Sequence, residues 1–223
     1  MTLSSSDWFG ALDATWPAQE MIAQDGWVFR VGAGGGKRVS ATTGLGDIAL
    51  AERVARDHDQ TALFMIRDGL DDQALDHALA ARGYEIIDPV ILMAREVAGG
   101  APLPEFEISD RAREIWAKGG IGPPRLAVME RTKGPKAVLE EDGGVAFFAQ
   151  SSDVAMIHAL EVHPDMRRRG VGRCLVTRAI EIAPQGWLAA AVVDRNHASL
   201  KLFESLGFQP VARYHYRIKV ENL

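Results

Sequence analysis

The segment from residue 154 to residue 182 restricts the fold more than any other part of the chain. A long apolar strand is expected over 154–162, and a helix over 167–182 that opens with three consecutive arginines and a Gly-x-Gly spacing. Glycines let the backbone approach a ligand closely, and free N–H groups at a helix start favour an anion. Arginines add charge-assisted hydrogen bonds. This strand–turn–helix unit indicates an α/β fold with a phosphate or pyrophosphate site at the turn.

Strand and helix patterns alternate along the rest of the chain. Two glycines and two prolines within residues 98–104 predict a linker. We therefore expect two units, 1–97 and 105–223. The first has the order helix, two strands, helix, strand, helix, strand, which is a shorter version of the second. The shared order suggests a duplication, although no residue match demonstrates it.

Charge and composition exclude several classes of protein. The formal net charge of −5 argues against a general nucleic-acid binder. Lys and Arg number 8 against 15 Asp and Glu before residue 99, and 17 against 15 from there on, so the basic excess lies in the half with the arginine turn. Cys174 is the only cysteine, which excludes an intrachain disulfide, and we expect it in the core.

Targeting and metal-binding patterns are not found in the sequence. The first 16 residues lack the basic and apolar segments of a signal peptide, and no apolar run approaches the ~20 residues of a membrane helix. The six histidines show no ligand spacing, so no metal site is expected. We expect a cytoplasmic protein with no membrane or nucleic-acid partner.

Two motifs in the second half resemble the signatures of a known family. Arg167–Gly172 matches the pattern Arg/Gln-x-x-Gly-x-Gly/Ala after a strand. The second pattern is Asn, then a small residue, Leu, an aromatic residue and Gly-Phe, and its residues are Asn196, Ser199, Leu202, Phe203, Gly207 and Phe208. Together they resemble the GNAT superfamily of acyl-CoA-dependent N-acyltransferases. The resemblance covers about residues 105–220, and residues 1–97 carry neither signature.

The resemblance implies a GNAT-like α/β fold with a mixed sheet, a catalytic domain over 105–223 and a degenerate GNAT-like unit over 1–97. Its co-substrate would be acetyl-CoA, whose pantetheine arm would enter a gap between two splayed strands, one ending near Val162 and one near Asp194. The residues implied to contact coenzyme A are Leu160, Glu161, Val162, Arg167, Arg168, Arg169, Gly170, Val171, Gly172, Arg173, Asn196, Ser199 and Phe203. A backbone N–H near Leu160 or Glu161 would polarise the thioester carbonyl.

Candidates for proton transfer are less sharply defined. The family often has Tyr where Phe203 stands, and phenylalanine has no proton to give to the departing thiolate. Strict alternation places Met156, His158, Leu160 and Val162 on one face, so His158 is a candidate general base, with a hydrogen-bonded structural histidine as the equal alternative. Glu161 ranks lower, because it lies on the opposite face unless a β-bulge redirects it. Tyr214 and Tyr216, near the expected acceptor site, are more often structural.

The glycine-rich run Gly32–Lys37 does not fit a nucleotide-binding loop. A P-loop would need Gly at position 31 and Ser or Thr at 38, where Val31 and Arg38 stand. The run also lies between two expected strands rather than before a helix. We therefore interpret it as a flexible hairpin turn.

These patterns together predict an acetyl-CoA-dependent N-acetyltransferase that acts by direct attack of an amine in a ternary complex. The acceptor would be a small-molecule or peptide amine, and the protein a monomer or homodimer. Two alternatives stay open: a non-catalytic CoA-binding regulatory module, which Phe203 favours, and an acyltransferase acting on a different acceptor group.

Overall fold

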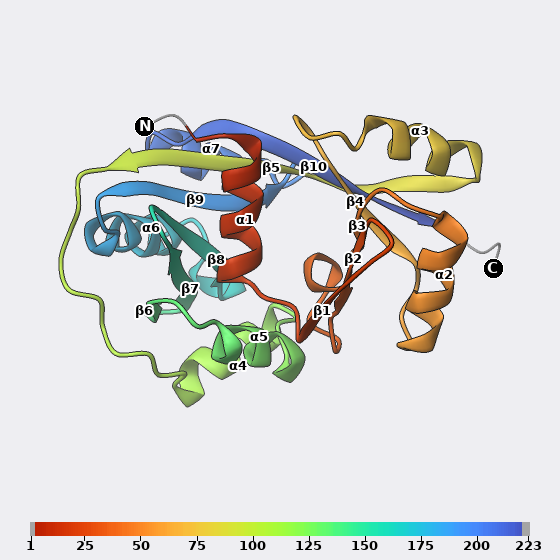
Figure 1. Cartoon of the computed structure of the whole chain (residues 1–223). Coiled ribbons are helices and arrows are strands. Elements are labelled where there is room, and N and C mark those ends of the chain that lie inside the picture. Colours follow the sequence, from red (N-terminus) through yellow and green to blue (C-terminus); the bar gives the residue numbers. More distant parts are fainter. Residues whose placement is uncertain (1–2, 220–223) are drawn as a thin grey trace.

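Two β-sheets organise the chain, and the structure, a computed structural model, describes residues 3–219 (Figure 1). The larger sheet has the strand order β4-β10-β5-β9-β8-β7-β6, and the smaller one the order β1-β2-β3. The strands are β1 (Glu20–Gln24), β2 (Trp27–Val31), β3 (Thr43–Gly44), β4 (Leu63–Arg67), β5 (Tyr84–Val97), β6 (Lys136–Glu141), β7 (Gly144–Ser151), β8 (Val154–Val162), β9 (Gly186–Val193) and β10 (Gln209–Lys219). The helices are α1 (Ser5–Thr15), α2 (Ile48–Asp57), α3 (Gln73–Ala81), α4 (Asp110–Lys118), α5 (Pro123–Arg131), α6 (Val171–Ile182) and α7 (His197–Ser205), with short 3-10 turns η1 (Lys37–Val39) and η2 (Pro164–Met166).

Three local expectations need correction. The helix expected over 167–182 begins only at Val171, because the residues before it form a turn in which Gly170 has φ +88°. The second of the two strands expected around the glycine-rich run, over 39–43, is replaced by the end of η1 and the two-residue strand β3. Cys174, expected in the core, is exposed on α6.

The large sheet takes strands from both sides of residues 98–104. Strands β4 and β5 precede this segment and the other five follow it, yet β5 lies between β9 and β10, and β10 lies between β4 and β5. In Figure 1 the chain after β5 descends along the side of the sheet to α4. The ranges 1–97 and 105–223 therefore do not form separate sheets, and the large sheet is shared between them.

The two halves nevertheless follow a common order within this shared sheet. In the first half, Thr42 bridges Phe64 in parallel, and α2, β4, α3 and the long strand β5 follow β3. In the second half, β8 pairs with β9 in parallel, and α6, β9, α7 and the long strand β10 follow β8. This repeated order is what a tandem arrangement would produce, and the tandem arrangement stays a prediction.

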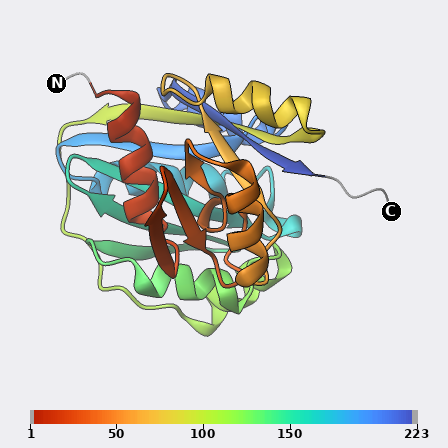
Figure 2. The same cartoon turned by 45° about the vertical axis from the view of Figure 1, so that its right-hand side comes forward.

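Helices cover both faces of the large sheet. On one face, α6 packs through Val171 and Leu175 against inward side chains such as Phe148. On the other face lie α1, whose Trp8 joins a second cluster, and α4 and α5, which pack around Phe147. The small sheet and α2 come forward in Figure 2. No helix within residues 3–219 combines the length and apolarity needed to cross a membrane.

Strand β8 contains a β-bulge where it lies against β7. Phe147 pairs with His158, and Val145 pairs with Glu161, so two steps along β7 correspond to three along β8. Ala159, inside the extra step, has φ +50°. The indole N–H of Trp116 on α4 donates to the carbonyl oxygen of Ala159 at 2.7 Å and holds the bulge in place.

The bulge changes which side chains share a face. Met156 and His158 lie on the face covered by α1 and α4, but Leu160 and Val162 pack with the α6 cluster on the opposite face. The prediction that these four residues share one face is therefore wrong beyond His158. Glu161 lies on the same side as His158, because their partners on β7 are two residues apart. The bulge is therefore the condition under which Glu161 shares a face with His158.

Candidate functional site

The parallel pairing of β8 and β9 stops part-way along both strands. The last paired residues are Ile157 and Ala190, whereas β8 continues to Val162 and β9 to Val193. Ala159 and Leu160 have no register partner on either neighbouring strand. A cavity of about 340 Å³ opens here, lined by residues 157–160 of β8 and 190–193 of β9. The splayed strands expected from the sequence are confirmed.

The arginine turn lies between the end of β8 and the start of α6. Gly170 is the N-cap, and no side chain caps the helix, so its first N–H groups are free to bind an anion. The guanidinium group of Arg167 is tied back to β8, donating to the Val162 carbonyl oxygen and to Glu161 at 3.1 Å each. Arg168 and Arg169 are exposed beside the uncapped helix start.

The start of α7 forms the other side of the opening. The side chain of Asn196 accepts from the Ser199 backbone N–H at 3.1 Å and caps the helix. Asn196, Ser199 and Phe203 all line the cavity. The ring of Phe203 is buried and packs edge-on against Phe208, with ring centres 5.0 Å apart.

His158 lies in the cavity wall with both ring nitrogens hydrogen-bonded. The hydroxyl of Thr15 donates to the Ala11 carbonyl oxygen at 2.7 Å, so it accepts in its 2.9 Å bond with Nε2 of His158. Nε2 therefore carries the proton, and Nδ1 accepts from Nη1 of Arg38 at 3.1 Å. Burial, followed by the charge of Arg38, holds the pKa of His158 well below its ordinary value. The ring is therefore neutral near neutral pH.

Comparison with known proteins matches the "Acetyltransferase (GNAT) family" to residues 126–208, the range that holds both the arginine turn and the start of α7. These residues form a GNAT domain. Curated relatives of this segment include the L-amino acid N-acyltransferase MnaT of Escherichia coli (strain K12), which is 34% identical over 90 residues, 35% of this chain and 52% of the relative. The peptidyl-lysine N-acetyltransferase YjaB of the same strain is 35% identical over 77 residues, 34% of this chain and 50% of the relative.

The GNAT fold extends beyond the matched segment. The solved structure of a GCN5-related N-acetyltransferase from Kribbella flavida covers 100% of this chain and 97% of its own, with a TM-score of 0.66 and 14% sequence identity. This likeness concerns the fold of the whole chain. By sequence, the chain spans about half the length of the curated relatives it matches.

The GNAT residues predicted to contact coenzyme A fall into two groups. Leu160, Asn196, Ser199 and Phe203 line the cavity. The other group, Glu161, Val162 and the segment 167–173, does not line the cavity. These residues run from the end of β8 to the uncapped start of α6. This order suits an extended ligand with a thioester at one end and phosphates at the other, and the binding roles stay predictions.

Neither side chain predicted to take part in proton transfer is free. His158 would have to give up its bond from Arg38 before Nδ1 could accept a proton. The carboxylate of Glu161 is paired with Arg167 at 3.1 Å, and Glu161 is not among the cavity residues. This arrangement does not favour the base role predicted for either residue.

The glycine-rich run of the first half is part of the site, which its sequence did not indicate. It connects β2 to η1 and β3, as a hairpin connection would, but Gly35, Gly36, Lys37 and Arg38 also line the GNAT cavity. Gly35 is packed so closely that a Cβ atom would lie 2.7 Å from Val128 on α5. Two basic residues directly after three glycines were the available signal, but the sequence could not place this loop against β8.

Proposed function

We propose that this GNAT protein transfers the acyl group of acetyl-CoA to the amine of an acceptor by direct attack in a ternary complex. The observation that carries the proposal is the single cavity at the splay of β8 and β9. It is lined on one side by the start of α7 and on the other by Trp16, Arg38 and His158. One cavity in contact with both faces of the sheet can receive two substrates from opposite sides.

The features around the splay support acetyl-CoA as the donor. The unpaired strand edges at Ala159 and Leu160 offer backbone groups to a pantetheine arm, which would lie between β8 and β9 as an added strand. The uncapped start of α6 and the exposed arginines beside it suit the pyrophosphate. A Cβ atom on Gly172 would lie 3.3 Å from Leu202, so glycine also permits close packing of α6 on α7.

In the proposed reaction, the amine nitrogen attacks the thioester carbonyl carbon, and the carbon–sulfur bond then breaks. A backbone N–H of the bulge stabilises the negative charge that develops on the carbonyl oxygen. The nitrogen loses its proton, and the CoA thiolate gains one through water, because Phe203 has no proton to donate. Positioning in the cavity supplies much of the acceleration.

We assign positioning roles to the two side chains that the sequence offered as catalytic. His158 holds Arg38 through Nδ1, and Glu161 holds Arg167 against the end of β8. The acceptor then enters the reaction as the free amine. This assignment predicts that loss of the imidazole acts through Arg38 rather than through a titrating base.

Calorimetry with acetyl-CoA and a thiol-release assay across an amine panel test the function. We expect saturable binding of acetyl-CoA and amine-dependent release of CoA thiol. Absence of binding at millimolar acetyl-CoA contradicts the proposal. Binding without thiol release for any amine favours the regulatory CoA-binding module, the reading that Phe203 supports.

A further inference from the structure

Arg38 carries a half-buried positive charge with no carboxylate partner among the described residues. Its side chain enters the cavity from η1, and Nη1 donates to the neutral ring of His158. Its Nε is buried and has no hydrogen-bond partner within residues 3–219. No ion pair of Arg38 occurs within the same range. A partly desolvated charge without a counter-ion carries a cost, so this arrangement requires an explanation.

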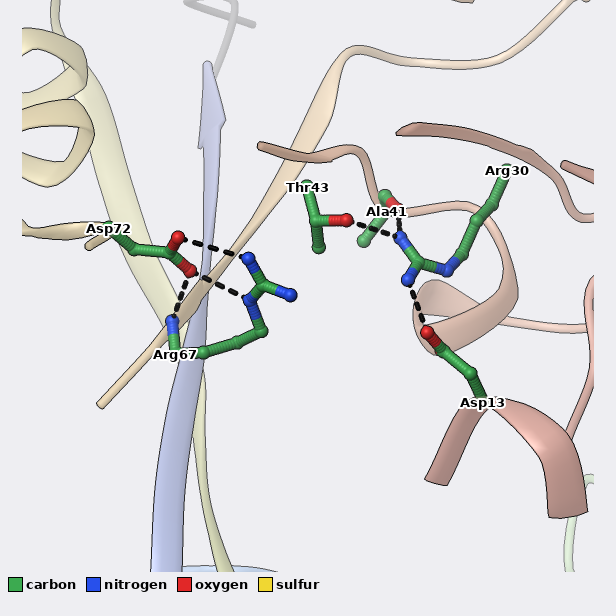
Figure 3. A network of polar contacts seen from close by, with 6 residues as sticks. All are labelled: Asp13, Arg30, Ala41, Thr43, Arg67 and Asp72. Atoms are coloured by element: carbon green, nitrogen blue, oxygen red, sulfur yellow. Dashed lines mark hydrogen bonds and ion pairs between the residues drawn. The ribbon is translucent and has the colours of Figure 1, made fainter. Parts of the chain in front are cut away.

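Three other arginines with little exposure are neutralised by carboxylates. Arg30 pairs with Asp13 at 2.6 Å, and Arg67 pairs with Asp72 at 2.8 Å (Figure 3). Arg217 pairs with Asp76 at 2.8 Å. Arg30 also leaves its Nε unpaired, but its charge is balanced by Asp13. Within residues 3–219, Arg131 also lacks an ion pair and leaves Nη2 without a partner, but only Arg38 of these two lines the cavity, where a ligand can supply an anion.

The surroundings keep Arg38 charged. Burial works to lower the pKa of Arg38, but the phenol groups of Tyr214 and Tyr216 beside it outweigh burial and leave the pKa raised. Arginine therefore stays protonated at all working pH values. Both tyrosines line the cavity and are buried.

The remaining charges of the cavity wall do not cancel Arg38. Asp88 is the one acidic residue among the lining residues, and it is already bound by Lys37 and Arg195 at 2.8 Å each. The exposed side chain of Arg125 adds a further positive charge to the wall. The cavity therefore favours an anionic group in the ligand.

We propose that the acceptor amine carries a carboxylate, and that Arg38 binds this carboxylate as the specificity-determining residue of the site. This inference rests on the proposed function and names its substrate class. A carboxylate accepts charge-assisted hydrogen bonds from a guanidinium group, and Nε is available to donate one.

The side of the sheet assigns the carboxylate to the acceptor rather than to the acyl donor. Arg38 contacts His158, whose ring packs against Trp16 and Phe147 on the face covered by α1 and α4. The elements proposed to hold acetyl-CoA, α6 and α7, cover the opposite face. An acyl donor with its own carboxylate is the competing source, and it is a separate arm of the test.

The kinetic test compares matched amines. Glycine, β-alanine, L-alanine, L-methionine and L-phenylalanine are assayed against their carboxamides, with acetyl-CoA as donor. We expect kcat/KM to be about 100-fold higher for the carboxylates, the size expected for hydrogen bonds to a charged group. Arg38→Met removes this preference, Arg38→Lys restores part of it, and both leave the acetyl-CoA Kd unchanged. Equal use of acids and amides by the unmodified protein overturns the proposal.

Two further arms keep the result decisive. Succinyl-CoA with simple amines tests the competing source, and an Arg38-dependent preference for succinyl-CoA over acetyl-CoA overturns the assignment to the acceptor.

A thermal-shift measurement with the same carboxylates and carboxamides at 10 mM, with CoA present, needs no turnover. An Arg38-dependent shift with carboxylates alone supports the proposal, and no shift with any of them contradicts it. If carboxylates raise the Tm through Arg38 but the protein does not bind acetyl-CoA, the proposed function is contradicted instead.

Arg30→Met is the matched control for folding. Removal of Arg30 leaves Asp13 unpaired, so we expect a clear loss of thermal stability. Arg38→Met breaks no ion pair and removes only the hydrogen bond to His158, so its unliganded Tm should fall clearly less than that of Arg30→Met. A fall in Tm as large as that of Arg30→Met shows that Arg38 is structural and overturns the inference.

Discussion

At the scale of single residues, His158 shows how its environment decides a role that the residue type leaves open. A histidine on a strand beside the expected thioester is equally compatible with a base and with a structural group. The structure adds Thr15 on one ring nitrogen and Arg38 on the other. These partners lie 143 and 120 residues away along the chain, so no local pattern could have indicated them.

The lowered pKa of His158 predicts how stability depends on pH. The unfolded chain binds a proton at this position below about pH 6.5, whereas the folded protein does so only at much lower pH. Stability is therefore complete above pH 6.5 and is lost as the pH falls below it. From pH 7.5 to 5.5 we expect His158 to account for a loss of about 1 kcal/mol. Urea unfolding of His158→Gln should show a smaller loss over this range, and equal losses contradict the assignment.

At the scale of elements, strand and helix order was largely predictable, but the bulge of β8 was not. Hydrophobic alternation through Met156 to Val162 looks regular in the sequence, and every residue there suits a strand. The extra residue becomes visible only when β8 is set beside β7, with Trp116 bonded to Ala159. The start of α6 was predictable as a site because Gly-x-Gly and arginines act locally, through backbone conformation and charge.

Gly170 offers an element-scale test with a matched control. Gly170 has φ +88° and Gly83, after α3, has φ +79°, and at neither position would a Cβ atom meet another group within 4 Å. Alanine at either position should therefore cost a similar 1–2 kcal/mol from the left-handed conformation alone. We expect only Gly170→Ala to weaken acetyl-CoA binding, by at least about tenfold for one distorted anion-binding amide group.

Urea unfolding and calorimetric titration of the two variants give the measurements. Equal stabilities of the two variants, with a loss of acetyl-CoA affinity in Gly170→Ala alone, place the phosphate-binding site at the start of α6. Unchanged affinity in Gly170→Ala would locate the phosphates elsewhere.

At the scale of the whole molecule, the two halves are joined because the long strands β5 and β10 each pair with strands of the other half. We call this arrangement the exchange of long strands. β10 pairs with β4 on one side and β5 on the other, and β5 also pairs with β9 along eight residues. The repeated order of elements predicted two similar units, but the choice of partner for β5 and β10 depends on contacts about 90 residues or more apart in the chain. Sequence patterns specify which residues form strands and do not specify which long strand lies beside which.

This exchange predicts that residues 105–223 do not fold alone. Without residues 1–104, β10 loses both neighbours and β9 loses one edge. We expect the isolated fragment to lack cooperative urea unfolding by circular dichroism, and addition of a separate 1–104 fragment to restore it. Cooperative unfolding of 105–223 by itself, with acetyl-CoA binding intact, contradicts the prediction.

The exchanged strands also set an order of events during translation. When β5 leaves the ribosome, its final neighbours β9 and β10 have not yet been made, because they lie about 90 to 120 residues further along the chain. Such long sequence separations slow folding, because the loop must close before the contacts form. Until then, the apolar strand β5 has two unpaired edges, which are the surfaces that chaperones cover and through which nascent chains aggregate. The large sheet, and with it the cavity, can be completed only after the last strand is made.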